Sequence, residues 1–146
     1  LALKLHSIFM NSVRSDAGVY RQHAVRIVGV NLPTASSISV PKLMSAVMVQ
    51  IAEKTKDIIA SSANIHSQFE KIHPFSDGNG RIGRLLMNAM LLNANFAPAI
   101  IRQEQKRLYY NYLYKAQTEE DYGQLEDFLC DAVMDGFKIS DRTDVR

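Results

Sequence analysis

Apolar residues recur with helical spacing along most of this chain, and no other feature of the sequence restricts the fold as strongly. Leu43, Val47 and Ile51 follow one another at every fourth position, and a second apolar stripe runs through 58–72. Side chains at such intervals lie on one face of an α-helix. The pattern therefore predicts two helices before residue 73.

Helices are also expected on either side of this pair. Residues 1–13 carry apolar side chains at mixed helical intervals, and 81–93 is rich in Leu, Met and Ala, which are strong helix formers. Two more helices are expected at roughly 102–117 and 122–138. The sequence thus predicts a mainly α fold.

One segment, 19–34, departs from the helical pattern. Val25 and Ile27 alternate with polar residues, Gly29 supplies a turn, and Pro33 ends the stretch. We therefore expect a small β-hairpin beside the helices.

Composition bounds the remaining possibilities. With 47% apolar and 22% charged residues, 1–146 is expected to form one domain with its own core. A net charge of +2 gives little reason to expect a nucleic acid or an acidic membrane as partner. Cys130 is the only cysteine and no apolar run approaches the roughly 20 residues that span a bilayer, which favours a cytoplasmic protein. Because the chain opens at Leu1 in a helical pattern, we expect a missing upstream region.

Chemically active residues are concentrated between two predicted helices. Residues 73–84 read His-Pro-Phe-Ser-Asp-Gly-Asn-Gly-Arg-Ile-Gly-Arg. Gly78 and Gly80 allow the backbone to approach a ligand closely, and their N–H groups at a helix start would bind an anion. Arg81 and Arg84 project from the first turn of that helix, where guanidinium groups can bind phosphates. The segment predicts a phosphate-binding loop.

Three further side chains of this loop suggest a reaction. The imidazole of His73 is suited to removing a hydroxyl proton, and Asp77 can hold Mg²⁺ together with phosphate oxygens. Asn79 offers a neutral donor to an α-phosphate oxygen. Taken singly, a histidine at a helix end is usually a capping or packing residue, the two glycines would form a C-cap and turn, and the two arginines a solvated helical face. Their combination favours a catalytic site. Phe75 is interpreted as an apolar anchor of the loop.

These residues match, at each position, the signature His-x-Phe-x-Asp/Glu-Gly-Asn-Gly-Arg-x-x-Arg of the Fic family, and roughly 3–135 resembles a Fic domain. The resemblance implies a helical core with a hairpin flap, and transfer of AMP from ATP to a Ser, Thr or Tyr hydroxyl of a target protein. It implies His73 as general base and Asp77 as Mg²⁺ ligand. The nucleotide phosphates would be bound by Gly78, Asn79, Gly80, Arg81 and Arg84.

Two other regions resemble family sites. The hairpin is similar to the flap on which an extended target segment pairs, and the flap residues would be Val25, Ile27, Val28 and Gly29. It is equally possible that the hairpin covers the core and has no role in target binding. Tyr110 and Gln117, seven residues apart on one helical face, resemble the family's adenine-side positions, although Asn is more usual than Gln there. A surface amide beside the neighbouring tyrosines is an alternative role for Gln117.

The resemblance leaves several activities open. Gly80 argues against the related Doc-type kinases, in which a Lys takes that position. Transfer of another group, removal of AMP, or a non-catalytic nucleotide-binding module remain alternatives. No Ser or Thr is followed by Glu four residues later, so the family's inhibitory motif is absent. An upstream inhibitory helix or an antitoxin-like partner could supply it, and the family makes a homodimer plausible. If the protein is an effector, it would act in another cell's cytosol.

Overall fold

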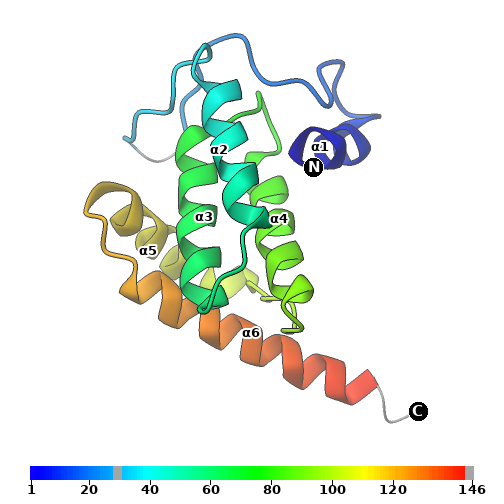
Figure 1. The fold of residues 1–146 in the computed structure, drawn as a ribbon, viewed down its shortest axis with the longest axis vertical. Coiled ribbons are helices and arrows are strands. Elements are labelled where there is room, and N and C mark those ends of the chain that lie inside the picture. The colour runs from blue at the N-terminus through cyan, green and yellow to red at the C-terminus, as the bar shows by residue number, and fades with distance from the viewer. Residues whose placement is uncertain (28–30, 144–146) are drawn as a thin grey trace. The chain divides into compact units, whose positions relative to one another are not determined.

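All regular secondary structure in the computed structural model, which describes residues 1–27 and 31–143, is helical (Figure 1). The prediction of a mainly α fold is therefore confirmed. Within these residues, every helix is too short or too polar to span a bilayer. In chain order the elements are α1 (Ala2–Met10), α2 (Val40–Ala52), α3 (Ile58–Ile72), α4 (Asn79–Asn93), the short 3₁₀ helix η1 (Gln103–Gln105), α5 (Lys106–Thr118) and α6 (Gly123–Thr143).

The chain divides into two compact units. The first comprises residues 1–53 and 68–86, and the second comprises 54–67 and the chain from 87 onward. The first unit contains α1, α2, the end of α3 and the start of α4. The predicted phosphate-binding loop, 73–84, therefore belongs to the first unit as a whole.

Local chemistry explains where the central helices begin. Pro41 is the second residue of α2, where the missing N–H has no partner to lose. Asp57 precedes α3, and its Oδ1 accepts the N–H of Ala60 at 3.0 Å, which satisfies one of the unpaired donors of the first turn. These positions agree with the helix starts that the apolar pattern predicts.

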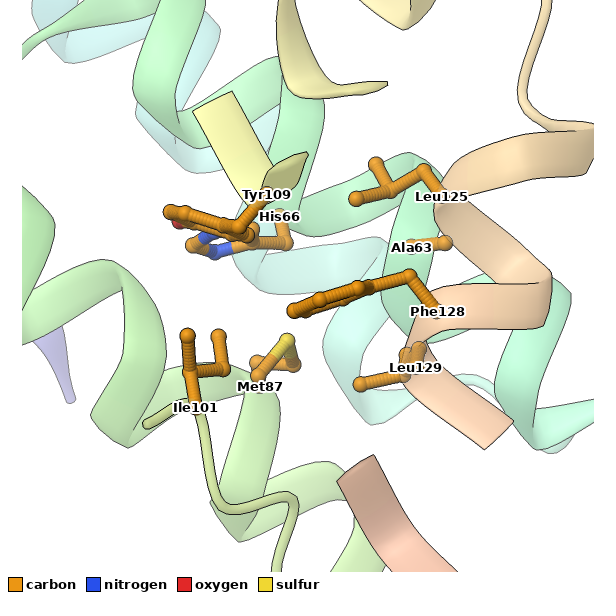
Figure 2. A pocket seen from close by; sticks show the side chains of 8 residues that line it. All are labelled: Ala63, His66, Met87, Ile101, Tyr109, Leu125, Phe128 and Leu129. Atoms are coloured by element: carbon orange, nitrogen blue, oxygen red, sulfur yellow. The ribbon is translucent and has the colours of Figure 1, made fainter. Parts of the chain in front are cut away.

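The second unit is built around a dense apolar core in which α5 packs against α6 (Figure 1). Gly136 lies inside α6 because a Cβ there would come within 2.0 Å of the Pro98 carbonyl oxygen. A small cavity of about 10 Å³ lies in this core, and Figure 2 shows the side chains that line it. At its edge His66 Nε2 lies 2.6 Å from the Tyr109 hydroxyl oxygen, so these two polar groups are hydrogen bonded to each other.

The predicted hairpin is not seen in the described part of 19–34. Residues 19–27 and 31–34 contain no strand, and Val28 and Gly29 lie outside the described residues. A single side-chain bond, from Thr34 Oγ1 to the Val25 carbonyl oxygen at 3.0 Å, joins the two limbs. A lone two-stranded ribbon is only marginally stable, and Pro33 lacks an N–H for a ladder. The alternating pattern was therefore insufficient to specify strands.

Candidate active site

His73 is the first residue beyond α3. Its N–H still donates to the Phe69 carbonyl at 3.0 Å, and its φ of 52° ends the helix in the left-handed conformation. The ring Nδ1 lies 3.2 Å from the Glu70 carbonyl oxygen. Because a carbonyl can only accept, Nδ1 carries the proton of this bond and Nε2 keeps a lone pair. His73 is thus prepared to accept a proton at Nε2.

The surroundings of His73 favour its neutral form. Burial lowers the pKa of His73 because a charged imidazolium would lose hydration. The hydrogen bond to the Glu70 carbonyl opposes this shift, and the positive charge of Arg21 adds to it. At neutral pH the imidazole is therefore available as a general base.

The loop after His73 has the backbone geometry of an anion site. Gly78 has a φ of +82°, which residues with a side chain rarely adopt, and its carbonyl accepts the N–H of Ile82 at 3.0 Å as α4 begins. Gly80 is helical, and its role is spatial. A Cβ at this position would lie 3.2 Å from Arg84 Nη1 and 3.9 Å from Glu70 Oε1. Glycine therefore leaves room for the Arg84 head at the N-terminus of α4.

Asn79 closes the loop on itself. Its side chain is 3% exposed, and it both accepts the Phe75 N–H and donates to the Phe75 carbonyl, each at 2.8 Å. The amide thus satisfies two buried backbone groups, and its role as a donor to the α-phosphate stays a prediction. The backbone N–H of Asn79 stays at the helix start.

Phe75 is fully buried, as expected for the anchor of the loop. Its ring stacks on His6, with centroids 3.8 Å apart and an interplanar angle of 3°. His6 also accepts the Gly18 N–H at Nδ1, 2.8 Å away, and donates from Nε2 to the Asp77 carbonyl at 3.1 Å. This residue, which the sequence pattern did not reveal, holds the loop from α1. The available signal was its spacing of four from Ala2 and from Met10, the other buried residues of α1.

Asp77 and Arg81 form an exposed ion pair across one helical turn. Asp77 Oδ2 lies 3.3 Å from Arg81 Nη2, and Oδ1 accepts the Gly78 N–H at 2.6 Å. Among the described residues, no three His, Cys, Asp or Glu side chains gather as a complete metal site. A single exposed carboxylate beside an anion site nevertheless fits Mg²⁺, which commonly takes one protein carboxylate together with phosphate oxygens and water.

Glu70 is a second carboxyl group near the loop that sequence reasoning missed. It is 7% exposed, and within the described residues Oε1 has no hydrogen-bond partner. Burial raises its pKa to about 7, while the charge of Arg84 acts in the opposite direction. Only its place three residues before His73, one turn back on the same helix, could have drawn attention to it.

The two adenine-side residues belong to the second unit, whereas the loop belongs to the first. Gln117 is buried and donates from Nε2 to the Ser67 carbonyl at 3.2 Å. Tyr110 is half-exposed, and its ring lies 5.0 Å from that of Tyr109. The alternative role that the sequence left open, a surface amide, is wrong because Gln117 is buried, and its role toward adenine stays a prediction.

Comparison with known proteins places this geometry in a family. A model described as "Fic/DOC family" matches residues 1–91, which include the whole loop. A protein named "Protein adenylyltransferase Fic" from Nematostella vectensis is 38% identical over 117 residues, which cover 78% of this chain and 26% of that protein. The chain therefore spans about a quarter of the length of this curated relative.

Solved structures agree in fold. A Fic family protein from Desulfovibrio desulfuricans G20 has a TM-score of 0.79 at 25% identity, over 99% of this chain and 47% of its own. Fic-1 from C. elegans has a TM-score of 0.83 at 23% identity, over 98% of this chain and 43% of its own. With the motif, the loop geometry and the family match together, the chain belongs to the Fic/DOC family.

Proposed function

We propose that this chain transfers AMP from ATP to a hydroxyl group of a target protein. The observation that carries the proposal is the pairing of a neutral His73, protonated at Nδ1, with the anion site at the start of α4. A base that lies six positions before Asn79, the first residue of α4, suits nucleotidyl transfer to a phosphate bound at the helix start. The names of the relatives, which are protein adenylyltransferases, support the same reaction.

The proposed step is a substitution at the α-phosphorus. The target oxygen attacks and forms a new P–O bond, and its proton passes to His73 Nε2. The bond from the α-phosphorus to the bridging oxygen breaks, and its electron pair leaves with pyrophosphate. His73 contributes by general-base catalysis, and the N–H group of Gly80 would stabilise charge that develops on phosphate oxygens. The Gly78 N–H would join it once the Asp77 carboxylate, which accepts that N–H here, turns to Mg²⁺.

The charged side chains of the loop would bind the triphosphate. Arg81 is exposed and Arg84 is half-buried at the start of α4, where both can donate to phosphate oxygens. Asp77 would hold Mg²⁺, which when bound neutralises part of the phosphate charge. Tyr110 and Gln117 remain the residues proposed for the adenine side.

A target segment would dock on 19–34. Val25 and Ile27 are half-buried there, and Val28 and Gly29 complete the proposed flap. A groove of about 400 Å³ lies next to this segment, with Pro33, Leu43 and Ile72 among its walls. Ile72 directly precedes His73. An apolar side chain of the target could therefore enter the groove while the hydroxyl of a neighbouring target residue faces His73.

The test is incubation with Mg²⁺ and ATP labelled on the α-phosphate, with and without host lysate. Label on protein should appear with the unmodified chain and vanish with His73→Ala. Asn11→Ala is a control, because Asn11 is an exposed residue of the same unit outside both the loop and the 19–34 segment and should keep the activity. ATP labelled on the γ-phosphate in parallel would reveal a kinase instead.

Each outcome distinguishes a function. α-Label that depends on His73 supports AMP transfer and leaves the target to be identified. ATP binding without label in any sample would contradict the proposal and favour another donor, AMP removal, or a non-catalytic nucleotide-binding module. A regulator, whether an upstream helix or a partner protein, would reduce labelling when added in trans.

A further inference from the structure

Arg21 is a buried cation that binds backbone carbonyl groups. It is 2% exposed, and Nε donates to the His73 carbonyl at 2.7 Å while Nη2 donates to the Ile72 carbonyl at 3.2 Å. Nη1 donates to the His23 carbonyl at 2.7 Å, and Nη2 also donates to the Ala35 carbonyl. One side chain therefore joins the end of α3 to His23 and Ala35, which are the two ends of the 23–35 segment.

The backbone of the same residue continues this contact. The Arg21 N–H donates to the Pro74 carbonyl at 3.0 Å, so residue 21 binds three consecutive carbonyl groups around His73. Among residues 1–27 and 31–143, Arg21 takes part in none of the ion pairs with a carboxylate. Its charge instead meets the negative end of the α3 dipole.

The chemistry of arginine is needed for this arrangement. Its planar guanidinium carries five N–H donors in a fixed fork, and three of its nitrogen atoms are used here. A lysine would keep the charge, but its single ammonium could not reach carbonyl groups on opposite sides. A buried charge without a carboxylate partner is unfavourable unless hydrogen bonds replace its hydration. A buried arginine at this position therefore indicates a role beyond packing.

We propose that Arg21 is a positioning residue of the transfer reaction, which fixes the backbone of His73 and the ends of the 23–35 segment in one register. This inference rests on the proposed function for its catalytic consequence. The base sits on one side of the guanidinium and the target-docking segment on the other. Arg21 thereby sets the distance between the imidazole and the incoming hydroxyl without touching either substrate.

The kinetic test compares Arg21→Lys and Arg21→Met with the unmodified chain. Displacement of a reacting group by about 1 Å can reduce a rate about 100-fold, so kcat should fall by about that factor in both variants. The KM for ATP should change less than about threefold, because the Gly78 and Gly80 amides and the arginines of α4 are untouched. Circular dichroism and thermal unfolding identify any variant that has lost its fold.

A second measurement does not depend on transfer activity. NMR titration of the His73 ring reports its pKa directly in the purified chain. Arg21→Met should raise this pKa, because the charge that helps to lower it is gone, whereas Arg21→Lys should leave it close to its original value. Glu70 and Arg84 are unchanged in both variants, so their charges cancel in the comparison.

Chemical rescue separates positioning from general stabilisation. Arg21→Ala leaves a space for guanidinium, which at millimolar concentration should restore part of kcat without raising the thermal midpoint. Rescue by guanidinium but not by ammonium would support the positioning role. Folded variants with an unchanged kcat and an unchanged His73 pKa would overturn it.

The two proposals can fail separately. If the unmodified chain does not label protein, the proposed function fails, and the NMR titration still decides whether Arg21 controls His73. If the unmodified chain labels protein and folded Arg21→Lys labels it equally fast, only the positioning role is wrong.

Discussion

At the scale of single residues, the buried carboxyl group of Glu70 connects the charge of the site to the stability of the fold. Its pKa is raised from 4.5 to about 7, so the folded chain holds this proton at pH values where the unfolded chain releases it. Below about pH 4.5 the carboxyl group is neutral in both states and does not reduce the free energy of unfolding. The reduction grows as pH rises and is complete above about 7.

We predict that Glu70→Gln removes this pH dependence. A shift of this size corresponds to about 3 kcal/mol in the free energy of unfolding, which the original chain loses between pH 4.5 and 8. Glutamine keeps the shape without the charge, so this loss of stability should disappear. The lowered pKa of His73 acts in the opposite direction in both chains, so the variant should become somewhat more stable as pH rises over that range. Urea unfolding at pH 5 and pH 8 measures the difference.

Glu53→Gln serves as the control, since Glu53 is an exposed glutamate of the same unit. That variant should keep the original pH profile. If Glu70→Gln and the original chain lose the same free energy on going from pH 5 to pH 8, the carboxyl of Glu70 is not the group responsible.

At the scale of elements, the loop between α3 and α4 depends on side chains that close it on itself. Asn79 pairs with both backbone groups of Phe75, across one turn at the very start of α4. The loop and the first helical turn therefore form one structural element, whose N–H groups are directed by the Asn79 amide.

We predict that Asn79→Ala loosens this element. Both Phe75 backbone groups would lose a buried partner, at about 1–3 kcal/mol each. Amide hydrogen exchange at Phe75 should accelerate, and ATP affinity should fall because the first turn of α4 is no longer held to the loop. Asn11→Ala, a change at an exposed position after α1, should alter neither quantity. Unchanged exchange at Phe75 would show that the loop is held by other contacts.

The elements also show what the sequence could predict. Helices were predictable because their apolar stripes are long, and α4 differs only in beginning at Asn79 instead of 81. α6 continues to Thr143, beyond the predicted 138, because residues 139–143 contain neither Gly nor Pro to end it. The hairpin was wrong for residues 19–27 and 31–34, where side-chain bonds from Arg21 to the His23 carbonyl and from Thr34 to the Val25 carbonyl stand in place of a cross-strand ladder.

At the scale of the whole molecule, the site depends on contacts between segments that are far apart in sequence. His6 and Asp77 are separated by 71 positions and Arg21 and His73 by 52, yet each pair is hydrogen bonded. The loop residues could be predicted because they are consecutive. His6 and Arg21 could not, because no local pattern indicates which distant backbone group a side chain will meet.

We predict that His6→Phe separates the two contributions of this histidine. Phenylalanine can still stack on Phe75, but it cannot accept from Gly18 or donate to the Asp77 carbonyl. Two partly buried backbone groups then lose partners, so the free energy of unfolding should fall by about 1–3 kcal/mol. Mg²⁺-dependent ATP affinity should also fall, and calorimetry with and without Mg²⁺ would measure it. Equal stability in the variant would mean that stacking alone fixes the loop.

The ion pair between Asp77 and Arg81 implies cooperative loading of the site. A phosphate that binds Arg81 would break the ion pair and release the Asp77 carboxylate. A cation that binds Asp77 would likewise release the Arg81 guanidinium. Thermodynamic linkage then requires that each ligand strengthen the binding of the other by the same factor. One turn of helix would thereby make the nucleotide and its cation behave as a single ligand.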